Sequence, residues 1–244
     1  SMSFEQAQER GLVVMIGEVV LDAYLDSVYE QHVPQKADDP LRVVYTPLHG
    51  TGLECVTRIL QRIGVTDIHV VEEQAQPDGN FTTCPYPNPE NRDALERGIA
   101  LCEKVHPDLL LATDPDADRV GIAVKDGDDY KLLSGNEVGV LLLDFICRSR
   151  IAAGTMPENP VAVTTIVSSS MVDPIAEHYG VEVRRVLTGF KYIGGVIAEL
   201  ESENRGDDFI FGFEESYGYL AGTHARDKDA VVASMLICQM ARYY

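Results

Sequence analysis

Three aspartates stand at alternate positions directly after an apolar run. They are Asp114, Asp116 and Asp118, and Arg119 follows at once. Alternate side chains of an extended segment share one face, so we expect the three carboxylates to converge. Like charges this close repel one another unless a cation lies among them. Because every donor is an oxygen, the sequence predicts a site for a hard divalent ion such as magnesium or calcium.

Two other interpretations of these aspartates stay open, and one is excluded. Asp and Pro are common in turns, so the segment could be a solvated acidic turn. A phosphate-transferring enzyme with Asp114 as its nucleophile would also carry an aspartate after a strand. An EF-hand calcium loop is excluded, because Arg119 and Lys125 occupy the positions that need Gly and Glu.

A second group of polar residues lies between the glycines at 212 and 218. The carboxylate of Glu214 and the hydroxyl of Ser216 suit hydrogen bonds with the hydroxyl groups of a sugar. Glycines on both sides let the backbone come close to a ligand. The alternative is a hairpin turn in which Glu214 and Glu215 are simply exposed.

A third segment contains Thr188, Gly189 and Lys191, after an expected strand over 183–187. A turn of this composition is suited to an anionic or hydroxylated ligand. Taken alone it is a weak signal, because a lysine in a loop is usually only solvated.

The fourth segment runs from 226 to 229 and precedes the last apolar helix. The lysine of this segment is Lys228. The neighbouring Asp227 and Asp229 could serve only as helix N-caps. His49, in a Pro-Leu-His-Gly segment, fits a hydrogen-bonding turn residue as well as a catalyst.

The composition describes a globular chain with a strongly acidic balance. Of its 244 residues 45% are hydrophobic and 24% charged, and the formal net charge is -19. This charge argues against nucleic acid and against an anionic membrane surface as partners. The five cysteines form no CxxC pair, so we expect a reducing, cytoplasmic location. The longest apolar run, 138–143, is far too short to cross a bilayer.

Apolar periodicity, together with Gly and Pro positions, predicts alternating helices and strands. Ser134 and Glu137 resemble a capping box at the start of a long helix, and Asn91 or Asp93 is a candidate cap for an earlier one. The expected elements are helix 5–32, linker 34–40, strand 43–45, helix 53–63, strand 68–71, a helix ending at 105, strands 109–112, 120–124 and 132–133, helix 134–151, strand 161–167, helix 171–179, strand 183–187 and an apolar strand after 207.

The order of elements is repeated along the chain. Residues 43–64 and 161–180 both contain a strand, a Ser/Thr-containing loop and a helix, and later each half has an acidic loop after an apolar strand. We therefore expect an α/β fold of two consecutive repeated α/β units, each a mixed sheet layered with helices. The expected division is a helical end of another domain plus linker over 1–37, a first unit over 38–155 and a second over 156–244.

Taken together, the motifs resemble those of the α-D-phosphohexomutase superfamily, especially its bacterial phosphoglucomutases. Any one of them would be weak evidence, but their order and spacing cover nearly the whole chain. The segments that carry the resemblance are Thr46-Pro-Leu-His-Gly50, Pro87-Asn-Pro-Glu90, Thr113-Asp-Pro-Asp-Ala-Asp-Arg119, Thr188-Gly-Phe-Lys191, Gly212-Phe-Glu-Glu-Ser-Tyr-Gly218 and Arg226-Asp-Lys-Asp229.

The resemblance implies roles for individual residues. It implies that Asp114, Asp116 and Asp118 are ligands of Mg²⁺, and that Arg119 supports a phosphoserine region. It also implies that Lys228 is a general acid or base, and the role of base requires a lowered pKa of this lysine. The implied substrate contacts are Thr188, Gly189, Lys191, Glu214 and Ser216.

The chain departs from the family pattern in what its sequence does not contain. It has no Thr-Ala-Ser-His-Asn-Pro segment, which carries the phosphoserine, and no Arg-x-Ser-Gly-Thr phosphate loop. The resemblance therefore implies the central part of a four-domain mutase whose first and fourth domains are partners of this chain. Hexose phosphate and hexose bisphosphate are the implied ligands. We expect this polypeptide alone to be inactive as a mutase.

The activity that the resemblance implies is magnesium-dependent interconversion of glucose 1-phosphate and glucose 6-phosphate. A phosphomannomutase or phosphopentomutase of the same superfamily is an alternative. A further alternative, of another class, is a non-catalytic α/β protein that binds metal or sugar. A magnesium-dependent phosphatase that uses Asp114 as its nucleophile is the third.

Overall fold

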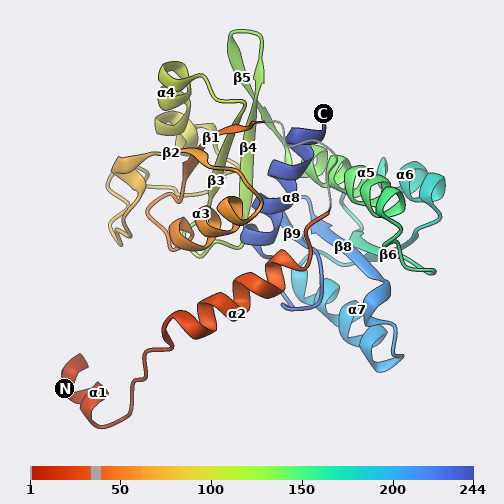
Figure 1. Ribbon diagram of the computed structural model, residues 1–244, viewed down its shortest axis with the longest axis horizontal. Helices are drawn as coiled ribbons and strands as arrows, with labels where there is room; N and C mark the ends of the chain where they lie inside the picture. Colours follow the sequence, from red (N-terminus) through yellow and green to blue (C-terminus); the bar gives the residue numbers. More distant parts are fainter. Residues whose placement is uncertain (1, 34–39) are drawn as a thin grey trace.

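The computed structural model describes residues 2–33 and 40–244, so almost all of the expected linker at 34–40 lies outside the described residues. A five-stranded sheet has the order β2-β1-β3-β4-β5, in which β2, β1 and β3 are parallel and β4 and β5 antiparallel (Figure 1). Its strands are β1 (Arg42–Thr46), β2 (Asp67–Val70), β3 (Leu109–Thr113), β4 (Val120–Asp126) and β5 (Asp129–Leu133).

A second sheet repeats this topology with four strands. Its order is β7-β6-β8-β9, with β7, β6 and β8 parallel and β9 antiparallel. The expectation of two repeated α/β units with mixed sheets is confirmed. The strands are β6 (Val161–Thr165), β7 (Glu182–Val186), β8 (Phe209–Glu214) and β9 (Gly218–Leu220).

Helices connect the parallel strands of both sheets, as parallel pairing requires. In each unit one helix joins the first two strands, and another precedes the third. The first unit uses α3 (Leu53–Arg62) and α4 (Glu96–Val105), with short 3₁₀ turns η1 (Glu72–Gln74) and η2 (Arg92–Leu95); the second uses α6 (Val172–Tyr179) and α7 (Phe190–Ser202), with η3 (Gly206–Asp208). Neither Asn91 nor Asp93 caps α4, because Asn91 precedes η2, Asp93 lies within η2, and the N-cap residue of α4 is Leu95.

The long helix α5 (Gly135–Ala153) begins with the expected capping box of Ser134 and Glu137 and ends at Gly154 in the left-handed region. Its neighbours are β8 and α6, so it packs on the second sheet. A division after residue 155 leaves this helix in the first unit, whereas its contacts lie with the second. The helix belongs with the second unit because its buried apolar side faces β8 and not the hairpin of β4 and β5.

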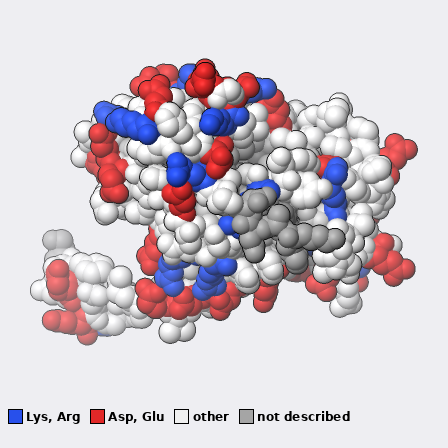
Figure 2. Space-filling model, turned by 45° about the horizontal axis from the view of Figure 1, so that its top comes forward, with Lys and Arg blue, Asp and Glu red and all other residues white. Residues whose placement is uncertain are grey.

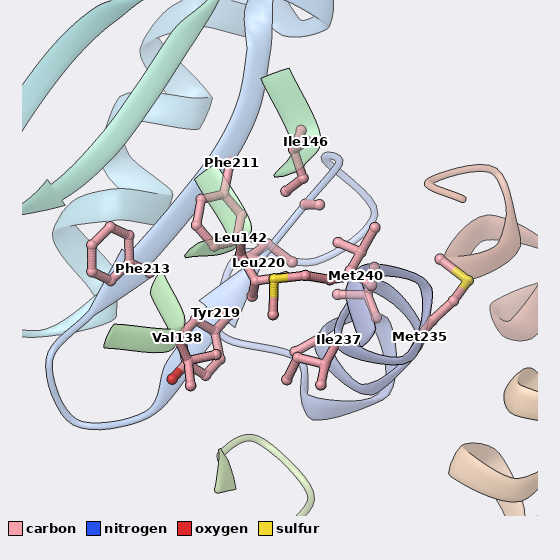
Figure 3. Close-up of a cluster of buried hydrophobic side chains, with 14 of the residues drawn as sticks. Val138, Leu142, Ile146, Phe211, Phe213, Tyr219, Leu220, Met235, Ile237 and Met240 are labelled. Atoms are coloured by element: carbon pink, nitrogen blue, oxygen red, sulfur yellow. The ribbon is translucent and has the colours of Figure 1, made fainter. Parts of the chain in front are cut away.

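The hydrophobic core is shared by the two units. Figure 3 shows Leu142 of α5 beside Phe211 of β8 and Leu220 of β9, and Val138 of α5 beside Tyr219 of β9, all of them fully buried. The same buried cluster continues into the first sheet. Helix α8 (Ala230–Tyr243) lies between the sheets in Figure 1 and contacts α3, β3, β4, β9 and α5. The acidic segments that follow β3 and β8 are therefore held on one shared hydrophobic core.

The N-terminal part differs from the expected single helix over 5–32. It forms α1 (Phe4–Glu9) and α2 (Gly17–Tyr29), separated by residues 10–16. Gly11, just after α1, and Gly17, the first residue of α2, have positive φ angles of 68° and 64°, so the chain turns at both ends of this connection. Figure 1 shows α1 extending away from both sheets. None of the helices in the described residues has the length and apolarity to cross a membrane.

Candidate active site

The segment after β3 folds into a tight turn, which we call the aspartate turn (residues 114–119). The amide of Asp114 donates to the Arg119 carbonyl at 3.2 Å, and the amide of Ala117 donates to the Asp114 carbonyl at 3.0 Å. Ala117 adopts a left-handed φ of 56°. The carboxylates are therefore gathered by a closed turn and not by the extended alternation that the spacing suggested.

The three carboxylates do lie together. Each of Asp114, Asp116 and Asp118 offers an oxygen atom, and these atoms are within 4.8 Å of one another. Asp114 is buried, with 1% of its surface exposed, whereas Asp116 is exposed and Asp118 is intermediate. A cluster of oxygen donors open on one side fits a hard divalent cation such as Mg²⁺.

Asp114 organises the turn from inside. Its carboxylate accepts hydrogen bonds from the amides of Asp118 (3.1 Å) and Arg119 (2.9 Å) and from Nε of Arg119 (2.7 Å). Burial raises the pKa of Asp114 to about 6, although the bonds from Arg119 oppose this shift. The carboxyl group is thus costly to keep charged and yet is needed as the acceptor that closes the turn.

Two side-chain cations already balance part of this negative charge. Arg119 lies between Asp114 and Glu90, whose Oε1 is 3.4 Å from a guanidinium nitrogen. Lys228 places Nζ 2.9 Å from Oδ2 of Asp118 and 3.3 Å from Asp227. Repulsion among the aspartates therefore does not by itself require a metal ion, which corrects the first step of the sequence argument. Because Glu90 and Asp227 pair with the same two cations, five carboxylates face Arg119 and Lys228 before any ion binds.

The state of Lys228 also differs from what a general base requires. Burial lowers the pKa of its ammonium, but the bonds to Asp118 and Asp227 outweigh burial and raise the pKa above its usual value. In this arrangement Lys228 is an ammonium donor. The lowered pKa that the sequence argument required is absent while Asp118 is its partner.

The loop after β1 supports the aspartate turn from the other side. Thr51 donates its amide to the Pro115 carbonyl at 2.9 Å, and a Cβ on Gly50 would lie 2.3 Å from Cα of Pro115. His49 has a left-handed φ of 63°, and its ring bonds to Thr83 (2.8 Å). His49 is therefore a hydrogen-bonding residue of the turn, as one of its two interpretations held.

The equivalent turn after β8 carries the two glutamates, and we call it the glutamate turn (residues 214–217). Glu214 is 5% exposed, and burial raises its pKa despite the nearby Ser216 and Lys228. Glu215 points elsewhere, since its Oε2 accepts from the hydroxyls of Thr165 (2.8 Å) and Ser168 (3.3 Å). The alternative of a hairpin with two exposed glutamates is wrong, because Glu214 is buried.

The two turns are joined by their backbones. Arg119 and Gly218 form an isolated antiparallel bridge, and the Val120 amide donates to the Tyr217 carbonyl at 3.2 Å. Between the turns lies an open pocket of about 300 Å³. Most of the predicted site residues line it, namely Asp114, Asp116, Asp118, Arg119, Glu214, Ser216 and Lys228.

The third predicted segment is not brought into this pocket. Thr188 and Lys191 are exposed, and Gly189 is the N-cap residue of α7. Nζ of Lys191 lies 5.0 Å from the ring centre of Tyr192. The pocket lining, as far as the described residues define it, includes none of Thr188, Gly189 and Lys191.

Sequence reasoning missed a buried polar group beside the pocket. Asp229 caps α8 by accepting hydrogen bonds from the amides of Val231 and Val232, as the helix-cap interpretation of this residue predicted. It also accepts from the hydroxyl of Tyr24 and bonds to His224. The pair His224 and Asp229, five residues apart, was a weak signal in the sequence, and nothing there pointed to Tyr24.

The chain is similar to phosphoglucomutases and phosphomannomutases in sequence. Residues 22–127 match the phosphoglucomutase/phosphomannomutase alpha/beta/alpha domain II, and residues 134–244 match domain III of the same family. Phosphoglucomutases of Staphylococcus aureus strains USA300 and NCTC 8325 are 39% identical over 225 residues, which is 91% of this chain and 39% of theirs. The chain thus spans about two-fifths of the length of these relatives.

Solved structures share the fold at lower identity. A phosphoglucomutase/phosphomannomutase family protein from Burkholderia thailandensis matches with a TM-score of 0.69 and 18% identity, over 92% of this chain and 44% of that one. An Aspergillus fumigatus N-acetylphosphoglucosamine mutase, in complex with GlcNAc-6P and magnesium, matches with a TM-score of 0.60 and 15% identity, over 94% of this chain and 49% of that one.

Proposed function

The chain belongs to the α-D-phosphohexomutase superfamily, of which it contains domains II and III, and from this premise we propose that it is the central part of a phosphoglucomutase. The proposed reaction is the magnesium-dependent interconversion of glucose 1-phosphate and glucose 6-phosphate. The phosphoryl group would be carried by a serine outside this chain.

One observation carries the proposal: a cluster of carboxylates and two side chains suited to bind sugar hydroxyls line a single pocket. The aspartate turn contributes three carboxylates, and the glutamate turn contributes Glu214 and Ser216. Transfer of a phosphoryl group to a sugar hydroxyl needs a charge-stabilising site next to a hydroxyl-binding site. The backbone bonds between the turns fix the relative position of the two.

Each residue of the pocket has a proposed task. Asp114, Asp116 and Asp118 would hold Mg²⁺, which supplies positive charge for a transferring phosphoryl group. Arg119 would keep Asp114 ionised and add a second positive charge nearby. The carboxylate of Glu214 accepts, and the hydroxyl of Ser216 donates or accepts, hydrogen bonds of sugar hydroxyls. The ammonium of Lys228 would donate a proton or hydrogen bond to an oxygen of the substrate.

The hexose-phosphate class of ligand and magnesium are supported by a relative of known structure. The Aspergillus fumigatus enzyme of the same fold is described in complex with GlcNAc-6P and magnesium. We propose hexose phosphates and hexose bisphosphate as ligands, with Thr188, Gly189 and Lys191 as contacts that approach once further domains of the mutase surround the pocket. The five free thiols suit the proposed cytoplasmic location.

A phosphatase that attacks with Asp114 is disfavoured by geometry. A nucleophilic carboxylate needs a free oxygen directed at the phosphorus atom. Asp114 is 1% exposed, and both of its oxygens already accept hydrogen bonds. Its arrangement suits a supporting metal ligand rather than an attacking group.

Calorimetric titration with MgCl₂ tests the proposal on the chain as it is. We expect the wild type to bind Mg²⁺ and Asp116→Ala to lose most of the heat of binding, because one of the three carboxylates is removed. Since Asp116 is exposed, its removal leaves the turn folded. Asp128→Ala removes another exposed acid, from the β4–β5 turn, and should bind like the wild type. Equal heats for wild type and Asp116→Ala would count against the site. Mutase turnover by the chain alone would contradict the proposed external phosphoserine.

A further inference from the structure

We propose that Tyr24 and His224 are positioning residues, which hold Lys228 at the acidic pocket through the carboxylate of Asp229. This inference rests on the proposed function only for the role of Lys228, which is to donate to an oxygen of the substrate. The contacts themselves are independent of it. Neither residue lines the pocket, and both act through Asp229.

Asp229 is the fixed point of this arrangement. Its side chain is 6% exposed and accepts from the Tyr24 hydroxyl (3.0 Å to both oxygens) and from Nε2 of His224 (2.8 Å). It also accepts from the amides of Val231 (2.8 Å) and Val232 (3.2 Å). A buried carboxylate with this many donors has little freedom to turn.

The residues on either side of Lys228 and Asp229 are tied to the two turns. The amide of Asp229 donates to the Tyr219 carbonyl at 2.9 Å, just after the glutamate turn. The amide of Ala230 donates to the carbonyl of Ala117, inside the aspartate turn, at 3.1 Å. Fixing Asp229 therefore fixes the chain directly next to Lys228 relative to both turns.

The side-chain bond between His224 and Asp229 closes the segment 224–229 into a loop, and Lys228 lies within that loop. The stem of Lys228 passes over Gly218, where a Cβ would lie 2.5 Å from Cδ of the lysine. Nζ then reaches Oδ2 of Asp118 at 2.9 Å. If the loop is opened, the lysine can rotate away, because its side chain is long and has four rotatable bonds.

A helix cap alone does not explain Tyr24 and His224. The two amides of α8 already satisfy the capping role of Asp229. Nδ1 of His224 is buried and lacks a partner among residues 2–33 and 40–244, so within that part of the chain the imidazole is held by Asp229 on one side only. Tyr24 comes from α2, more than 200 positions away in the chain, and adds a tertiary bond to a carboxylate that was already capped.

Competitive acetylation of lysines tests the proposal without metal or substrate. The sequence has six lysines, and each reports its own accessibility by mass spectrometry after treatment with limiting acetic anhydride: Lys36, Lys104, Lys125, Lys131, Lys191 and Lys228. Lys228 is 18% exposed and ion-paired, so we expect it to react slowly in the wild type. The other lysines are internal references for each protein.

The variants separate positioning from general stability. Tyr24→Phe removes one oxygen atom, and His224→Ala opens the loop. We expect Lys228 to react about fivefold faster in each, the effect of losing one ordinary hydrogen bond, with the other lysines unchanged. His224→Gln keeps an N–H donor for Asp229 and should restore most of the protection. Tyr179→Phe removes a comparable bond, from Tyr179 to Asp144 at 2.8 Å, and should leave Lys228 protected.

Unchanged reactivity of Lys228 in Tyr24→Phe, whose fold is at least risk, would overturn the proposal. So would an equal increase in Tyr179→Phe, since this would show a general loosening. Failure of the proposed function has a different signature. In that case the wild type would not bind Mg²⁺, while the reactivity of Lys228 would still respond to Tyr24→Phe.

Discussion

The aspartate turn and the glutamate turn occupy the same place in two sheets of the same topology. Each begins directly at the end of a parallel strand, β3 or β8, and each leads into an antiparallel partner. Each also bends at a non-glycine residue in the left-handed region, Ala117 with φ 56° and Tyr217 with φ 67°. The repeated unit thus supplies one type of hairpin twice, with carboxylates at its tip.

The two turns differ in where their acids point. In the aspartate turn Asp114 accepts backbone amides from within the turn, and this draws Asp118 towards it. In the glutamate turn the longer Glu215 reaches back to Thr165, so Glu214 alone faces the pocket. A turn that closes on its own carboxylate gathers oxygens for a cation. A turn whose second acid is anchored elsewhere presents a single carboxylate, which suits hydroxyl groups.

The largest effect expected from this difference is on metal affinity. Asp114→Asn removes a ligand charge and should weaken Mg²⁺ binding by about 100-fold, since metal ligands act as ionised oxygens. Glu214→Gln changes a carboxylate in the equivalent turn and should leave Mg²⁺ affinity within about twofold, because Glu214 is not part of the cluster of carboxylates. Calorimetry of both variants measures the contrast. Equal losses would show that the two turns form one undivided metal site.

A second contrast concerns how each turn is docked. A Cβ at Gly50 would press on Pro115 of the aspartate turn, and a Cβ at Gly135 would lie 2.2 Å from the carbonyl oxygen of Glu215. Both Gly→Ala changes should lower the free energy of unfolding by about 1–3 kcal/mol, as overpacking does. Only Gly50→Ala should also weaken Mg²⁺ binding.

Urea unfolding and calorimetry measure these two effects separately. Gly195→Ala is the control, because nothing lies within 4 Å of a Cβ there and the site is inside α7. It should raise the free energy of unfolding by about 0.5–1 kcal/mol. A loss of Mg²⁺ affinity in Gly135→Ala as large as in Gly50→Ala would show that the docking of the glutamate turn also shapes the aspartate cluster.

The sequence was sufficient for the repeated α/β order, because apolar strands and glycine-ended helices are local signals. The Ser134–Glu137 capping box and the strand–acid–strand pattern around Asp114 are examples of this. It was insufficient where distant segments decide the outcome. Packing of α5 on β8, the pairing of Lys228 with Asp118 and the anchoring of Glu215 by Thr165 are all tertiary contacts.

The alternate spacing of the three aspartates also could not predict how their carboxylates come together. Alternate positions share a face only in extended backbone, and here the left-handed Ala117 reverses the chain. Alanine carries no sequence signal for that conformation, unlike glycine or asparagine. The same holds for Tyr217. The carbonyl of Ala117 accepts from the amide of Ala230 in α8, and the carbonyl of Tyr217 accepts from the amide of Val120 in β4. These tertiary backbone bonds become visible only in the fold.

The third prediction uses pH to distinguish the two turns. Burial raises the pKa of Asp114 to about 6, so protons compete with Mg²⁺ below that value. Lowering the pH from about 7.5 to about 5 should weaken Mg²⁺ binding about tenfold through this group. The metal-free chain should show the opposite sign. A carboxyl whose folded pKa lies above its unfolded value of 3.8 favours the folded state more as pH falls from about 6 to about 4.

Calorimetry and urea unfolding over this pH range measure the two signs. Asp114→Asn should lose the pH dependence of stability in this window, whereas Asp128→Ala should keep it. If the metal-free wild type instead lost stability steadily from pH 6 to pH 4, the carboxyl of Asp114 would be stabilised in its charged form by Arg119, contrary to the dominance of burial.

The smallest effect concerns the cation that links the turns. Arg119 belongs to the aspartate turn, but Lys228 comes from the second unit and pairs with Asp118. An ammonium on that carboxylate competes with a divalent ion. Lys228→Met should therefore raise Mg²⁺ affinity about three- to fivefold, the strength of a partly exposed ion pair. Arg226→Met, in the same segment but paired with Glu201, removes the same charge without a bond to the cluster and should change Mg²⁺ affinity by less than about twofold. A fall in affinity in Lys228→Met would mean that the lysine holds Asp118 in place for the metal, so that the second unit completes the site of the first instead of competing for it.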